Sequence, residues 1–98
     1  MAFLVTCTFD LKNATATDYE NAYSDLAKIG LGKVVVGSSG SKVVAPTTMT
    51  IGEFNGTNAG GVGDDLRDRV RRAFGARSFS SEIFVVVGGD WAWGCATT

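Results

Sequence analysis

Phe3-Leu4-Val5-Thr6-Cys7-Thr8-Phe9 is the stretch of sequence that decides the fold. Its odd-numbered residues are apolar, and its even-numbered residues include two threonines. This alternation is typical of a β-strand that buries one face. Asp10 follows directly, where we expect the chain to leave the sheet.

Two amphipathic helices are predicted on either side of the middle of the chain. Apolar residues recur every three to four positions over about 17–29: Tyr19, Ala22, Tyr23, Leu26 and Ile29. Thr17 and Glu20 have the spacing of a capping box at its start, and Gly30 is a stop signal. The same periodicity predicts a second helix over roughly 59–76, with an apolar face of Val62, Leu66, Val70, Ala73 and Phe74.

Three further strands are indicated. Residues 34–36 are a short valine run, and residues 42–45 either continue this strand or return alongside it. Residues 47–54 alternate again after Pro46, and Gly52 marks either a bulge or a close approach of two backbones. The continuous apolar run of residues 83–87 predicts a strand buried on both sides.

The order strand, helix, strand, strand, helix, strand predicts one α+β domain over residues 1–98. It is the ferredoxin-like βαββαβ pattern, with an antiparallel sheet and two helices on one face. Right-handed crossovers give the strand order 4-1-3-2. Leu4, Phe84 and Val86 then point away from the helices, and such apolar surface usually has a partner.

We therefore expect a homodimer. It forms through the open sheet face or by exchange of the C-terminal segment, which extends from about residue 90 to the partner subunit. Trp91 and Trp93 either anchor this interface or stack on nucleic-acid bases.

Composition excludes several functions. The 98 residues carry a net charge of −1 and no histidine, so Ser-His-Asp and Cys-His catalysis and histidine-ligated zinc are excluded. Cys7 and Cys95, near opposite ends, make neither a disulfide framework nor a metal knuckle. No signal peptide and no membrane span are recognisable, so we expect a soluble cytoplasmic protein.

Asp10 is the candidate catalytic and metal-binding residue. A carboxylate at a strand end, together with its twin across a two-fold axis, can hold Mg²⁺ or Mn²⁺ and activate water without histidine. The alternative is an aspartate that accepts hydrogen bonds from turn amides.

Arginines on the second helix are the nucleic-acid candidates. The spacing pairs Asp64 with Arg67 and Asp65 with Arg69, and it places Asp68 near both Arg71 and Arg72. A small basic patch is left for phosphate binding, formed by Arg71, Arg72, Arg77 and Lys33.

Several short motifs carry a resemblance to a known family. They are Phe9-Asp10-Leu11 with Tyr19 and Tyr23, Gly56-Thr57-Asn58-Ala59, Asp65-Leu66-Arg67-Asp68, Ile83-Phe84-Val85-Val86 and Gly89-Asp90-Trp91-Ala92. Together they resemble the small CRISPR-associated ferredoxin-like endonucleases and adaptors, with their stand-alone SinR-type and VapD-like relatives.

The resemblance implies that Asp10 is the metal-binding aspartate and that a dimer stacks its sheets and exchanges C-terminal segments. The chain departs from the family because it is not basic and lacks arginines after Asp10. We therefore expect a small dimeric interaction or scaffold protein that binds a protein partner or a small ligand and has lost catalysis. The alternative is a metal-dependent endonuclease acting on RNA or DNA with paired Asp10 carboxylates.

Overall fold

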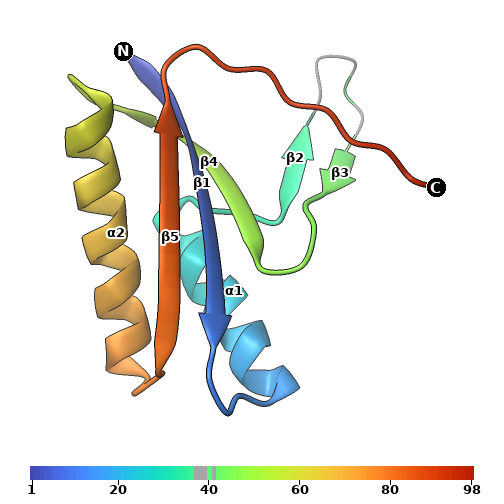
Figure 1. Cartoon of the computed structure of the whole chain (residues 1–98), viewed down its shortest axis with the longest axis vertical. Coiled ribbons are helices and arrows are strands. Elements are labelled where there is room, and N and C mark those ends of the chain that lie inside the picture. The colour runs from blue at the N-terminus through green and yellow to red at the C-terminus, as the bar shows by residue number, and fades with distance from the viewer. Residues whose placement is uncertain (37–39, 41) are drawn as a thin grey trace.

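The computed structural model describes residues 1–36, 40 and 42–98 (Figure 1). Its elements in chain order are β1 (Ala2–Leu11), α1 (Ala16–Ile29), β2 (Val34–Val36), β3 (Lys42–Val44), β4 (Met49–Asn55), α2 (Ala59–Ala76) and β5 (Ser81–Gly88).

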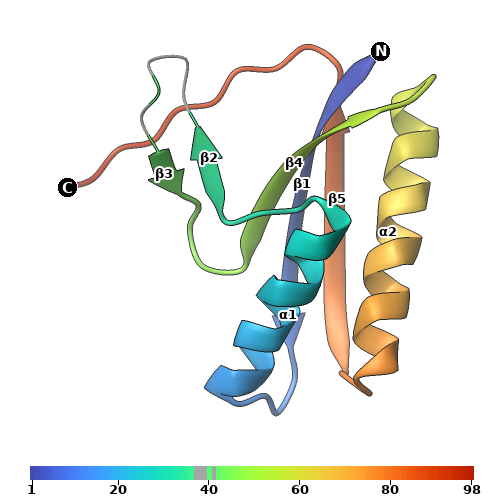
Figure 2. The same cartoon turned by 180° about the vertical axis from the view of Figure 1, so that it is seen from behind.

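The main sheet has three antiparallel strands in the order β4-β1-β5, so β1 is central. Both helices lie on one face of this sheet, as the two opposite views show (Figures 1 and 2). The predicted α+β class is confirmed, and the arrangement is compatible with a ferredoxin-like fold. The second helix has the predicted bounds because its four buried residues keep a helical period: Val62, Leu66, Val70 and Phe74.

The prediction of a fourth strand in this sheet is wrong. Beyond β4, the described residues form a single bridge, between Gly32 and Ile51, and β2 instead pairs with β3 in a separate two-stranded hairpin. The physical reason lies at the base of the hairpin. The Lys33 ammonium donates hydrogen bonds to the carbonyls of Ala45 and Pro46, and the Ala45 amide donates to the Lys33 carbonyl at 2.6 Å. These hydrogen bonds hold the start of β2 beside the end of β3, so residues 42–45 run back alongside β2 and do not extend it.

The core lies between the sheet and the helices. Alternate residues of β1 are buried there as predicted: Phe3, Val5, Cys7, Phe9 and Leu11. Ala22 and Leu26 of α1 join them, together with the four buried residues of α2. The Phe9 ring lies at the centre of an aromatic cluster, with ring centroids 5.1 to 6.1 Å from those of Tyr19, Tyr23 and Phe74.

Two predicted boundaries are corrected. The cap of α1 is Thr15 rather than Thr17, because the Thr15 hydroxyl accepts the Asp18 amide and the Asp18 carboxylate accepts the Thr15 amide. Strand β1 continues to Leu11, whose burial adds one more alternation, so Asp10 lies inside the strand rather than at its end. Gly30 ends α1 as expected, with φ of 108° in the left-handed region.

Candidate functional site

The face of the sheet away from the helices is the candidate functional surface, and we call it the open face. The register of the strands assigns its side chains: Leu4, Thr6, Thr8 and Asp10 from β1, Met49, Ile51 and Glu53 from β4, and Glu82, Phe84 and Val86 from β5. Phe84 is 67% exposed and Val86 is 52% exposed. The prediction that β5 is buried on both sides is therefore wrong for the single chain, because no element covers the outer side of this strand among the described residues.

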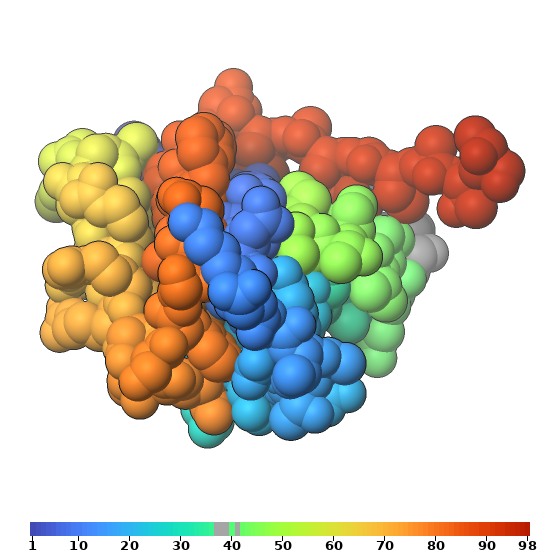
Figure 3. Space-filling model, turned by 60° about the horizontal axis from the view of Figure 1, so that its bottom comes forward, coloured from blue at the N-terminus to red at the C-terminus, as the bar shows by residue number. Residues whose placement is uncertain are grey.

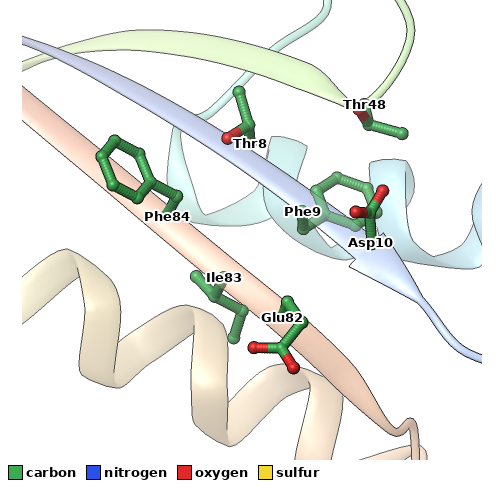
Figure 4. Close-up of a pocket in the computed structure, with 7 residues that line it drawn as sticks. All are labelled: Thr8, Phe9, Asp10, Thr48, Glu82, Ile83 and Phe84. Atoms are coloured by element: carbon green, nitrogen blue, oxygen red, sulfur yellow. The ribbon is translucent and has the colours of Figure 1, made fainter.

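A hollow of about 320 Å³ lies at one end of the open face, between β1 and β5 (Figure 4). It is lined by Thr8, Phe9, Asp10, Thr48, Glu82, Ile83 and Phe84. Asp10 is exposed and its carboxylate points toward Thr48, whereas the Glu82 carboxylate turns the other way. Glu82 accepts from the Lys12 ammonium at 3.2 Å. The two carboxylates therefore face one side of the sheet without converging.

The metal hypothesis gains no complete ligand set from one chain. Within the described residues, no group of three or more cysteine, aspartate or glutamate side chains is placed to hold a metal ion. A hard cation such as Mg²⁺ takes several oxygen ligands, of which one or two are carboxylates. Asp10 would therefore need a second chain or a phosphate substrate to complete its coordination.

The arginines of α2 are largely occupied by acids. The predicted pairs form: Asp64 with Arg67, Asp65 with Arg69, and Asp68 with both Arg71 and Arg72. The hydrogen bonds from Arg71 and Arg72 lower the pKa of Asp68.

The expectation that Arg77 is less closely matched to acids than the other arginines, and is left for a basic patch, is wrong. Its guanidinium forms a two-pronged ion pair with Asp25 of α1, with 2.9 Å between one nitrogen and Oδ1. The pair lowers the pKa of Asp25 and raises the pKa of Arg77. The pair is formed across 52 positions of sequence, so no local spacing could indicate it.

Lys33 does not join the arginines. Its ammonium is held at the base of the hairpin by the Ala45 and Pro46 carbonyls and lies 5.1 Å from the centre of the Tyr23 ring. Burial lowers its pKa. The predicted phosphate patch is thus two arginines shared with Asp68, one arginine paired with Asp25, and a lysine engaged elsewhere.

The remaining predicted interface residues lie where they are accessible. Leu4 is half-buried on the open face, and the segment after β5 carries Trp91, half-buried, and Trp93, 38% exposed. This segment contains no helix or strand, and it extends beyond the body of the molecule (Figures 1 and 3).

One exposed surface was not predicted. Val34, Val36 and Val44 of the hairpin are 53%, 60% and 68% exposed. Val34 lies directly opposite Val44, and Val36 opposite Lys42, so these four side chains share one face of the hairpin. The signal in the sequence is the valine run itself, which also fits the edge strand of the main sheet that the sequence predicts.

Fold and site together define a small α+β protein whose antiparallel sheet is covered by helices on one side and open on the other. No family model and no curated protein matches the chain. Among the described residues, every helix is too short or too polar to cross a membrane.

Proposed function

We propose that this chain is the subunit of a homodimeric, ferredoxin-like interaction protein, and that the open face is its dimer interface. The exposure of Phe84 and Val86 on that face is the observation that carries the proposal. Burying an apolar side chain of this size contributes about 1.5 to 3 kcal/mol. Leu4 and Ile51 adjoin them as half-buried members of the same face. In the dimer, the outer side of β5 becomes buried as its sequence indicates.

The open face alone is small for a stable interface. Eight residues of β5 span about 26 Å and three strands span about 14 Å, which gives on the order of 350 Å². A standard interface buries about 800 Å² on each partner. The C-terminal segment from about residue 90 supplies part of the difference, with Trp91 and Trp93 packing on the partner subunit. Such a dimer serves as a scaffold for a protein partner, the role of the adaptor proteins that the chain resembles.

The oligomeric state tests the proposal. We expect a dimer by size-exclusion chromatography with light scattering at micromolar concentration. Phe84→Ser shifts it toward the monomer, because it removes the largest exposed apolar side chain of the face. Ala27→Ser, on the exposed side of α1, is the matched control and leaves the mass unchanged. A wild-type monomer at this concentration refutes the proposal.

Metal-dependent cleavage of RNA or DNA is a second candidate function, favoured by the exposure of Asp10 over the hollow. A two-fold axis across the open face brings two Asp10 carboxylates to one interface, where Mg²⁺ or Mn²⁺ can bind and activate water. The proposed contacts to the nucleic acid are Arg71, Arg72, Arg77 and Lys33. Each of them would have to give up its present hydrogen bonds to bind a phosphate.

The assay compares cleavage of RNA and DNA by the wild type and by Asp10→Ala, with Mg²⁺ or Mn²⁺ added. Activity that is absent, or equal in the two proteins, removes this candidate. The dimer proposal is unaffected by that result, because it is carried by the apolar side chains of Phe84 and Val86 and not by catalysis.

A further inference from the structure

The β2–β3 hairpin lies beside the main sheet, attached to it through the Gly32–Ile51 bridge (Figures 1 and 2). One of its faces consists of Val34, Val36, Lys42 and Val44, and we call it the hairpin face. The three valines of this face are more than half exposed. A two-stranded hairpin is marginally stable by itself in water. Its apolar face is therefore best explained by a surface that covers it.

The charges of the hairpin and of the open face are complementary. Residues 31–47 contain Lys33 and Lys42 and no acidic residue. The open face contains Asp10, Glu53 and Glu82, and the nearby Lys12 pairs with Glu82. Because Lys33 is bound to carbonyl oxygens, Lys42 is the cation that the hairpin presents.

We propose that the hairpin face of one copy of this chain docks on the open face of a second copy, with its valines against Phe84 and Val86 and with Lys42 near Asp10 or Glu53. The inference rests on the proposed dimer and names the segment of the partner that covers the face. Under two-fold symmetry the contact is made twice, so each copy gives one hairpin and receives one. The two added contacts bring the small open face toward the area of a standard interface.

Cysteine cross-linking tests the contact directly. Cys95→Ser removes the exposed native thiol, whereas the buried Cys7 stays in place. In that background, one preparation carries Val36→Cys and another carries Thr6→Cys, at the centre of the open face. We expect the mixture to give a cross-linked heterodimer with a short bismaleimide. A preparation with Thr17→Cys, exposed on α1, replaces the Val36→Cys protein as the control and gives none.

Charge reversal provides an independent measurement of the same contact. Lys42→Glu is expected to raise the dimer Kd about tenfold, since attraction to the acidic face becomes repulsion. Adding Glu53→Lys to Lys42→Glu recovers part of the loss. Lys28→Glu, an exposed lysine on α1, is the control and leaves the Kd unchanged within about twofold.

The outcomes separate the two proposals. Hairpin docking is overturned if the protein is a dimer but gives no Val36–Thr6 cross-link and its Kd is unchanged by Lys42→Glu. The open-face dimer proposal is not contradicted by that result. A wild-type monomer overturns both. Cross-linking of the mixture together with a Kd sensitive to Lys42 supports the inference.

Discussion

Gly52→Ala tests whether the close approach between β4 and the end of α1 holds this fold together. A Cβ atom at Gly52 would lie 2.2 Å from the carbonyl oxygen of Gly30 and 2.8 Å from Cε2 of Phe54. Carbon and oxygen in contact lie about 3.3 Å apart, so the two backbones must separate by about 1 Å. Gly30 has little freedom to move, because it closes α1 with a φ of 108°.

The free energy of unfolding should fall by about 2 to 6 kcal/mol. Overpacking costs about 1 to 3 kcal/mol, and here it acts on backbone that cannot rotate away. The same displacement strains both hydrogen bonds of the Gly32–Ile51 bridge, now 3.0 and 2.9 Å long, each worth about 0.5 to 1.5 kcal/mol. A domain of this size has only about 5 to 15 kcal/mol in total. Because the bridge anchors the hairpin, dimer formation should weaken as well.

Urea denaturation followed by circular dichroism measures the loss, at a single protein concentration because a dimer makes stability concentration-dependent. The matched control is Gly75→Ala in α2, where an added Cβ meets nothing within 4 Å. This control should stabilise the protein by about 0.5 to 1 kcal/mol, as alanine does in a helix. A Gly52→Ala protein within about 0.5 kcal/mol of the wild type refutes the close-approach reasoning.

Three further predictions follow from single contacts. Arg77→Ala should destabilise the protein at pH 7 by removing the partner of Asp25. Since Arg77 lowers the pKa of Asp25 below its ordinary value of 3.8, this stability exists above that pH and is lost on acidification. The difference in denaturation midpoint from the wild type should therefore narrow below about pH 4, and a constant difference would contradict the linkage. Burial raises the pKa of the Cys7 thiol to about 11, so a thiol reagent at pH 8 should titrate Cys95 alone in the native protein and both thiols after unfolding. Thr15→Ala should lower the free energy of unfolding by about 1 kcal/mol in urea denaturation, whereas Thr17→Ala should change it little. A larger loss from Thr17→Ala than from Thr15→Ala would indicate that Thr17 is the helix cap, as the sequence predicts.

Elements with a long, regular period could be predicted from the sequence. Helix α2 keeps one apolar face over eighteen residues, and the buried residues of this helix in the core are those of that face. The sequence predicts the end of β1 too early, because the charged Asp10 is typical of a residue where a strand ends. Leu11 carried the missing signal, since it continues the alternation with one more buried side chain.

Contacts between distant parts of the chain could not be predicted in this way. The hairpin depends on the Lys33 ammonium reaching the carbonyls of Ala45 and Pro46, and a lysine in a valine-rich stretch gives no sign of such a partner. The Arg77–Asp25 pair joins the ends of two helices, whereas the charge pairs within α2 follow from their spacing of three and four. At the candidate site, the sequence indicated Asp10 and the apolar residues of β5. It does not indicate the exposed hairpin valines, because a short β-branched run fits an edge strand of the main sheet equally well.

The two proposed functions both depend on the open face. Within the described residues a single chain offers Asp10 without converging carboxylates, so metal-dependent cleavage requires a second copy to complete the site. Where the docked hairpin sets Lys42 beside Asp10 rather than beside Glu53, it brings a cation toward the same carboxylate. A lysine ammonium near Asp10 competes with a divalent cation for it, so a dimer closed by hairpin docking favours the interaction role over catalysis. Lys42→Ala in an intact dimer should then increase Mn²⁺ binding at Asp10, measured by calorimetry against the Asp10→Ala protein. Unchanged Mn²⁺ binding would place Lys42 elsewhere and leave the metal hypothesis to the nuclease assay alone.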